Sequence, residues 1–270
     1  MQPLHLCPPQ KLQRISGIFT DVDDTLTEHG QMSAATYTAL EQLQAAGIRV
    51  IPITGGPASW ADHIARVWPV TAAIGESGAV TYARTASGFR TLFAQTDALR
   101  NDNKIAREQA WAAIQTQFPA ARLAADQCFR LCDLAIDHGQ DVKLPPETVN
   151  AIVALLDAHG FTVRVSSIHI NAWHGSYDKP EAAQRIAKIL LGFDLAQQLD
   201  QWLYIGDSLN DEGMFGLFPL SVGVANIARV LEQLQQRPAY ITSASYGAGF
   251  VELAQTVLNA KAAVALGPHG

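Results

Sequence analysis

The segment Asp21-Val22-Asp23-Asp24-Thr25 places three carboxylates directly after the apolar run Ile15–Phe19, which is typical of a buried strand. Side chains alternate along a strand, so Asp21 and Asp23 project in the same direction if the strand reaches them. Neighbouring carboxylates repel, and each disfavours ionisation of the other. They tolerate one another when a cation lies between them or when one holds a proton. Phosphoryl chemistry uses both conditions, because one carboxylate can attack phosphorus while another shuttles the proton.

A second acidic segment lies far down the chain, where Gly206-Asp207-Ser208-Leu209-Asn210-Asp211 follows the short apolar run Trp202–Ile205. In an open α/β sheet, the groups at the carboxyl ends of the strands converge on one crevice. Magnesium prefers hard oxygen ligands, often one or two carboxylates completed by water and substrate phosphate. Two acidic strand ends therefore predict a magnesium site. Taken alone, an Asp-rich segment is also typical of ordinary turns and helix caps.

Two further segments suit a phosphate in the same crevice. The apolar run Ile48–Ile53 ends in Thr54-Gly55-Gly56-Pro57, whose hydroxyl and backbone N–H groups can cradle an anion. Lys179 precedes Pro180 at a predicted helix start, where the helix dipole disfavours a cation unless an anion is nearby. Each feature alone is more typical of a plain strand-to-helix turn and of a solvated lysine.

The four segments, in this order, resemble the motifs of the haloacid dehalogenase superfamily of phosphohydrolases, and the resemblance spans most of the chain. Asp21–Thr25 resembles the nucleophile motif, Thr54 the phosphate-binding hydroxyl, Lys179 the lysine, and Gly206–Asp211 the acidic motif. The long interval between Thr54 and Lys179 is similar to the subfamily with a large α/β cap, the Cof-type and sugar-phosphate phosphatases. Relatives often show Asn-Gly-Ala where this chain has Glu76-Ser77-Gly78-Ala79, so no substrate contact is transferred to that position.

The resemblance implies a magnesium-dependent phosphatase that acts on a small phosphorylated metabolite, with a sugar phosphate as the expected class. Asp21 is then the nucleophile, and Asp23 protonates the leaving group and later activates water. The implied metal site comprises Asp21, Asp207, Asp211 and the backbone carbonyl of Asp23. The implied phosphate-binding groups are Thr54, the Gly55 N–H, Lys179 and Asn210.

The alternation of strand and helix patterns predicts an α/β fold with a Rossmann-like parallel-sheet core. Predicted core elements lie in residues 1–83 and 175–270, and residues 84–174 are predicted to form an inserted α+β cap domain. A cap that closes over the crevice selects substrate and excludes water. Its candidate specificity residues are Arg130, Asn171 and His174, each of which has an ordinary surface or interface role as the alternative.

Composition limits the partners. The chain of 270 residues is 48% hydrophobic and 16% charged with a net charge of −6, which predicts ordered domains and argues against bulk electrostatic binding of nucleic acid or anionic membrane.

Cys7, Cys128 and Cys132 lack a metal-ligand pattern with nearby histidines, and the last two are expected to be buried on one face of a strand. No run reaches the ~20 apolar residues of a membrane span, so a soluble cytoplasmic protein is expected.

Three other functions remain open. A phosphomutase of the same superfamily would return the phosphoryl group to substrate instead of water. A non-catalytic module phosphorylated on Asp would also gather Asp, Thr and Lys around magnesium, but it has no need of an inserted cap. A nucleotide-binding role for Thr54-Gly55-Gly56 ranks lower, because the chain has neither a Gly-x-Gly-x-x-Gly nor a Walker pattern. Oligomeric state is not predicted.

Overall fold

The computed structural model describes residues 1–166 and 168–265. Its central layer is a six-stranded sheet in which every neighbouring pair is parallel, in the order β1 (Gln2–Pro3), β13 (Tyr240–Ile241), β12 (Ser221–Gly223), β11 (Trp202–Gly206), β2 (Gly17–Thr20), β3 (Arg49–Pro52). The predicted α/β class with a parallel-sheet core is confirmed. Strands β2 and β11, which precede the two acidic segments, are direct neighbours with Ile205 opposite Thr20.

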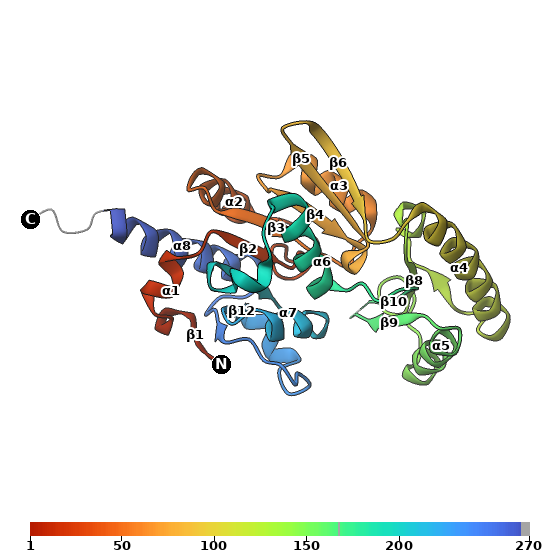
Figure 1. Ribbon diagram of the computed structural model, residues 1–270. Helices are drawn as coiled ribbons and strands as arrows, with labels where there is room; N and C mark the ends of the chain where they lie inside the picture. Colours follow the sequence, from red (N-terminus) through yellow and green to blue (C-terminus); the bar gives the residue numbers. More distant parts are fainter. Residues whose placement is uncertain (167, 266–270) are drawn as a thin grey trace, which may run out of the picture.

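Both faces of this sheet are covered by helices, as a parallel sheet requires (Figure 1). One face buries Ile18 and Val50 against α1 (Pro9–Gln13), α2 (Ala34–Ala45), α3 (Ala58–Val67) and α8 (Tyr246–Ala265). The other buries the alternating residues Phe19 and Ile51 with α6 (Lys179–Ile186) and α7 (Glu212–Leu217). Ser33 caps α2 as its sequence predicts, because its hydroxyl accepts a hydrogen bond from the Thr36 N–H.

A smaller antiparallel sheet continues this layer, with the order β4 (Ala72–Gly75), β5 (Val80–Thr85), β6 (Gly88–Phe93). A parallel bridge between Ile53 and Ile74 joins it to the end of β3. The turn residues Ala86-Ser87-Gly88 between two strand-like runs predict a hairpin; β5 and β6 form it, and it projects from the edge of the layer in Figure 1. The boundary predicted between residues 83 and 84 lies within β5, and the division into domains stays a prediction.

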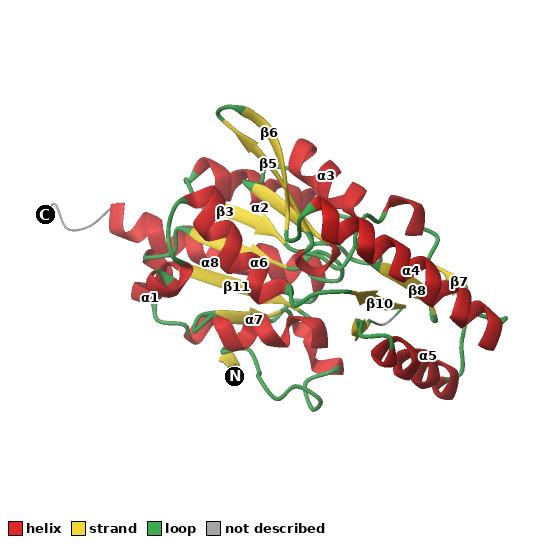
Figure 2. Ribbon diagram, turned by 45° about the vertical axis from the view of Figure 1, so that its right-hand side comes forward, coloured by secondary structure: helices red, strands yellow, loops and turns green. Residues whose placement is uncertain are grey.

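Residues 97–173 form a separate layer, seen on the right of Figures 1 and 2. We call it the cap. Its antiparallel sheet has the order β7 (Arg122–Leu123), β8 (Leu134–Asp137), β10 (His169–Trp173), β9 (Thr162–Val165). One face of this sheet packs on α4 (Asp97–Gln117) and α5 (Pro146–Ala158) around Ile136 and Ile170, which leaves the other face for the core.

Three local predictions are wrong. The sequence pattern predicts a helix over 227–236, but the structure has only a 3-10 helix at Ala225–Arg229 followed by turns, although Ile227 and Leu234 are buried. The alternation of apolar and polar residues predicts a strand over 130–137, but the strand begins only at Leu134. Cys128 therefore lies in a 3-10 turn and is exposed, whereas Cys132 and Cys7 are buried.

The helix that begins at Lys179 changes at Ala187–Leu191 to a π-helical turn and stops at Gly192, whose φ of 80° suits glycine. Gly267–Gly270, predicted to be frayed, lie outside the described residues. Among the helices of the described chain, none combines the length and apolar character needed to cross a membrane.

Candidate active site

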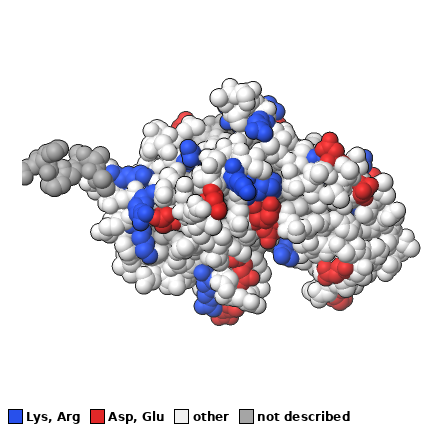
Figure 3. Space-filling view, viewed as in Figure 1, with Lys and Arg blue, Asp and Glu red and all other residues white. Residues whose placement is uncertain are grey.

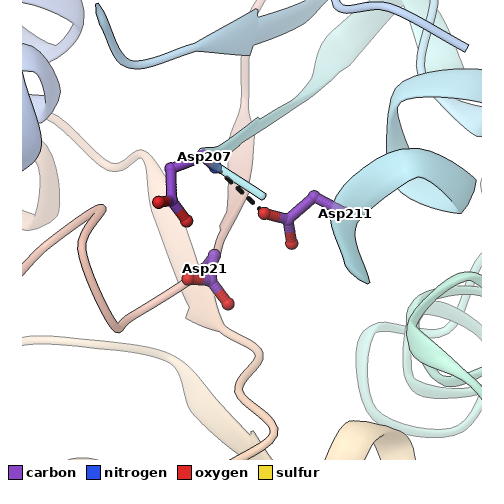
Figure 4. A group of neighbouring side chains, drawn as sticks. All are labelled: Asp21, Asp207 and Asp211. Atoms are coloured by element: carbon purple, nitrogen blue, oxygen red, sulfur yellow. Dashed lines mark hydrogen bonds between the residues drawn. The ribbon is translucent and has the colours of Figure 1, made fainter. Parts of the chain in front are cut away.

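The two acidic segments meet at the carboxyl edge of the central sheet. The backbone N–H of Asp21 donates to Ile205 O (2.9 Å), so the turn after β2 continues alongside the end of β11. This pairing brings Asp21 beside Asp207, as the strand-end rule predicts. One carboxylate oxygen from each of Asp21, Asp207 and Asp211 lies within 4.8 Å of the others (Figure 4).

Lys179 joins two of these carboxylates. Its ammonium donates to Asp21 Oδ1 and to Asp211 Oδ1, both at 2.6 Å, and lies 3.4 Å from Asn210 Oδ1. Burial alone would lower the pKa of Lys179, but the two carboxylates raise it above its usual range. Lys179 therefore keeps its charge in a nearly dry environment, and the anions expected from its place at the helix start are present.

Asp211 is held from every side by the protein. Its Oδ2 accepts hydrogen bonds from the backbone N–H groups of Asp207 (2.9 Å) and Ser208 (3.0 Å), and its Oδ1 accepts from Lys179 and from the Tyr204 hydroxyl. Burial opposes its ionisation, but Lys179 and these donors hold the pKa of Asp211 below its ordinary value. Asp211 is therefore a fixed anion that orients Lys179 and the turn that carries Asp207.

In contrast to Asp211, the carboxyl groups of Asp21 and Asp207 have pKa values above their ordinary range. Burial raises the pKa of Asp21 to about 8 despite Lys179, and burial with the charges of Asp21 and Asp211 raises the pKa of Asp207 to about 9. The protein thus gathers more negative charge than Lys179 can neutralise. Asp21 and Asp207, crowded beside the fixed anion Asp211, offer hard oxygen donors that fit a divalent cation such as magnesium.

Thr54 follows β3, on the other side of β2 from β11, and contacts the second aspartate of the first motif. Its hydroxyl donates to Asp23 Oδ2 (3.0 Å) and accepts from the Gly56 N–H (2.8 Å). Asp23 lines the cavity and is exposed to it, although protein surrounds the carboxyl on most sides. That burial raises its pKa above the ordinary value, although the Thr54 hydrogen bond opposes the shift. A carboxyl with a raised pKa can carry a proton, as an acid catalyst must.

These residues open into a cavity of about 900 Å³ between the core and the cap. The outline of the molecule is indented between the two parts in the space-filling view (Figure 3). The core contributes Asp21, Asp23, Gly55, Asp207 and Asn210 to the lining, and the cap contributes Phe129, Arg130, Arg164, His169 and Asn171. The volume is typical of a pocket for a small molecule.

The structure separates the three cap residues proposed for specificity. Arg130 and Asn171 line the cavity, whereas His174 lies away from it with its ring packed on Phe161. Arg130 pairs with Asp126 (2.9 Å) and Asp133 (2.9 Å), and it donates to Gly55 O (3.1 Å). Asn171 donates to Asp133 Oδ2 (3.2 Å). Arg130 therefore links the cap to the turn that follows Thr54.

Two site residues were missed by the sequence analysis. Asn226 follows β12 and donates from Nδ2 to Asp207 Oδ2 and to the Asp24 backbone oxygen, both at 3.0 Å. The rule that polar residues at parallel strand ends converge could have found it. Glu76 is fully buried, and its carboxylate accepts hydrogen bonds from the core and from the cap. No pattern in the sequence around Glu76 predicts that it joins the core to the cap.

The comparisons with known proteins agree with this geometry. Residues 18–110 match the family model of haloacid dehalogenase-like hydrolases. A phosphoglycolate phosphatase of Methanospirillum hungatei is 26% identical over 242 residues, which cover 88% of this chain and 95% of the relative.

Solved structures share the fold. A protein of Thermoplasma acidophilum superposes with a TM-score of 0.69 at 18% identity, covering 90% of this chain and 98% of that one. The sucrose-phosphatase of Synechocystis sp., solved with sucrose and phosphate, superposes with a TM-score of 0.62 at 17% identity, covering 89% and 97%. At these identities the superpositions establish the fold alone.

Proposed function

We propose that this chain, a phosphatase of the haloacid dehalogenase-like hydrolase family, acts on a small phosphorylated metabolite, with a sugar phosphate as the expected class, and depends on magnesium. The contact that carries the proposal is the 2.6 Å hydrogen bond between Lys179 Nζ and Asp21 Oδ1. It fixes one oxygen of a buried carboxylate at the edge of a cavity and leaves Oδ2 to act as the nucleophile. The similarity to a phosphoglycolate phosphatase supports a small substrate, and the sucrose-phosphatase with the same fold is consistent with it.

In the first step, Asp21 Oδ2 attacks phosphorus, and an aspartyl-phosphate forms as the ester P–O bond breaks. Asp23 gives its proton to the departing oxygen, so the product leaves as an alcohol. In the second step, Asp23 takes a proton from water that attacks phosphorus. The bond to Asp21 breaks, inorganic phosphate is released and Asp21 is regenerated. Thr54, the Gly55 N–H, Asn210 and Lys179 bind the phosphoryl oxygens in this scheme.

Asp21, Asp207 and the backbone carbonyl of Asp23 would hold the magnesium ion. When bound, the ion supplies positive charge that offsets the repulsion between Asp21 and the phosphoryl oxygens. Asp211 is assigned to positioning Lys179, because both of its oxygens are already engaged by protein donors. Asn226 positions Asp207 through its 3.0 Å hydrogen bond.

Hydrolysis of p-nitrophenyl phosphate with and without magnesium tests the proposal. The wild-type protein should release phosphate only with magnesium, and Asp21→Asn should abolish turnover because an amide is a poor nucleophile. Asp157→Asn, an exposed change on α5, is the matched control and should leave the rate unchanged. Near-normal turnover by Asp21→Asn would overturn the assignment. Stable self-phosphorylation of the wild-type chain without turnover would instead favour the non-catalytic module.

A further inference from the structure

The cap wall of the cavity is one face of the β8–β10–β9 sheet. Arg164 on β9 is directly opposite Asn171 on β10, so their side chains share a face. His169 lies two residues before Asn171 on the same strand and therefore projects to that face as well. All three line the cavity. The intervening Ile170 and Ala172 are buried on the other face against α4 and α5.

The polar side chains on this wall differ in the ion pairs and hydrogen bonds that they already form within the protein. Arg130 is neutralised by Asp126 and Asp133, and Asn171 donates to Asp133. Arg130 donates from all three of its guanidinium nitrogens to protein groups and has little hydrogen-bonding capacity left for a ligand, whereas Asn171 is held in place by its one hydrogen bond to Asp133. Neither residue brings an uncompensated charge to the wall.

Arg164 and His169 are the exceptions. Within the described chain, Arg164 donates only to the neighbouring Val163 backbone oxygen (3.0 Å) and forms no ion pair. His169 is only 8% exposed, yet its Nε2 has no hydrogen-bond partner among the described residues. An unsatisfied buried nitrogen costs free energy unless a ligand meets it.

We propose that Arg164 and His169 form a subsite for a carboxylate of the substrate, so that the preferred substrates are phosphate esters of hydroxy acids, sugar acids included. This inference rests on the proposed phosphatase function. The guanidinium fork matches a planar carboxylate through two parallel hydrogen bonds, and the imidazole N–H adds a third.

The charge of the cap wall favours a carboxylate over a second phosphate group as the part of the substrate that binds there. Burial and the nearby Arg130 lower the pKa of His169, so the ring is neutral near pH 7, and among the described residues of the cap wall Arg164 supplies the positive charge without an ion pair; Arg229 lines the core side of the cavity and donates to the Tyr246 hydroxyl. One positive charge balances a monovalent carboxylate but not a dianion. The cavity also contains Asp23, Asp24 and Asp126, which oppose further negative charge.

Matched pairs of esters test the inference. Each pair differs only in a carboxylate against a hydroxymethyl group: phosphoglycolate and 2-hydroxyethyl phosphate, 3-phosphoglycerate and glycerol 3-phosphate, 6-phosphogluconate and sorbitol 6-phosphate. The wild-type protein should prefer the acid in at least one pair. Arg164→Gln should reduce that preference in kcat/KM by about 10- to 100-fold, mainly through KM, and leave the hydroxymethyl ester unaffected.

Three further variants separate binding from general damage. Arg164→Lys keeps the charge without the fork and should retain part of the preference. His169→Ala should reduce it by about 3- to 10-fold. Arg122→Gln alters an exposed cap arginine outside the cavity and should change nothing.

The possible failures are distinguishable. Equal hydrolysis of acid and hydroxymethyl esters in every pair, or an equal loss on both esters in Arg164→Gln, would overturn the carboxylate subsite while the phosphatase function stands. No hydrolysis of any ester or of p-nitrophenyl phosphate would overturn the proposed function and the subsite with it.

Discussion

The Glu76 carboxylate accepts a 2.6 Å hydrogen bond from the backbone N–H of Cys132, a residue 56 positions further along the chain. Its two oxygens also accept from the N–H groups of Leu131 (2.8 Å), Asp133 (3.0 Å) and, in the core, Ala58 (3.0 Å). Glu76 is fully buried and adopts a φ of 49°, which non-glycine residues rarely do. One side chain thus joins the start of α3 to the cap segment next to Arg130.

Glu76→Gln should destabilise the protein by about 2–4 kcal/mol, because the amide nitrogen cannot accept hydrogen bonds and would leave buried N–H donors unpaired. Urea denaturation measures the change. Glu41→Gln on the exposed face of α2 is the matched control and should stay within about 0.5 kcal/mol of the wild type. A loss as small as that of the control would show that the three hydrogen bonds from the cap segment to Glu76 do not hold the cap to the core.

His169 should make stability depend on pH below neutrality. Burial and Arg130 lower its pKa below the ordinary 6.5, although Asp126 and Asp137 oppose the shift and His138 adds to it. As the pH falls, the unfolded chain binds this proton before the folded chain does. Its contribution to stability is therefore complete above about pH 6.5 and is lost as the pH falls through the folded-state pKa.

Thermal unfolding at pH 7.5 and pH 5.0 measures this dependence. The wild-type Tm should fall more on acidification than that of His169→Asn, which cannot titrate. His5→Asn, an exposed histidine, should follow the wild type. Parallel pH profiles for wild type and His169→Asn would show that the ring is not held neutral by its surroundings.

Magnesium should stabilise the folded protein without any substrate present. The crowded carboxylates of Asp21, Asp207 and Asp211 repel in the absence of a cation, so binding to the folded state alone raises stability. At a free concentration of 100 times Kd, the gain is ~2.7 kcal/mol, or several degrees in Tm. Asp207→Asn should lose most of this shift, whereas Asp157→Asn should keep it. A full shift in Asp207→Asn would place the ion elsewhere.

The catalytic edge was predictable because its residues follow strand ends. Asp21 and Asp207 each succeed an apolar run, and neighbouring parallel strands place them together whatever the rest of the chain does. Thr54 follows the same rule after β3. Lys179 was indicated by its misfit at a helix start, and the structure places it between Asp21 and Asp211.

The cap wall was less predictable because it depends on contacts between segments distant in sequence. Arg130 reaches Gly55 O, 75 positions away in the sequence, only through the fold, and Arg164 had no local feature to mark it. The false helix over 227–236 has a similar cause. Its apolar residues Ile227 and Leu234 do reach the core, but they do so from successive turns, which periodicity alone cannot distinguish from a helix.

Asp23→Asn should separate the two halves of the reaction. An alkyl ester needs a proton on its leaving oxygen, so the variant should lose about 10²–10⁴-fold in kcat. Nitrophenolate leaves without protonation, so the first step with p-nitrophenyl phosphate should remain fast while hydrolysis of the aspartyl-phosphate, which needs the base, becomes slow. Thr54, whose hydroxyl is 3.0 Å from Asp23 Oδ2, would still orient the Asn side chain.

Rapid mixing should then reveal a burst of one nitrophenolate per active site followed by slow turnover, together with a phosphorylated protein detectable by mass spectrometry. The double variant Asp21→Asn/Asp23→Asn is the control and should give no burst, because no aspartyl-phosphate can form on an amide. A single slow phase without a burst would mean that Asp23 limits formation of the intermediate even with a good leaving group. If Asp23→Asn hydrolysed alkyl esters at the wild-type steady-state rate, another residue of the cavity would have to transfer the proton.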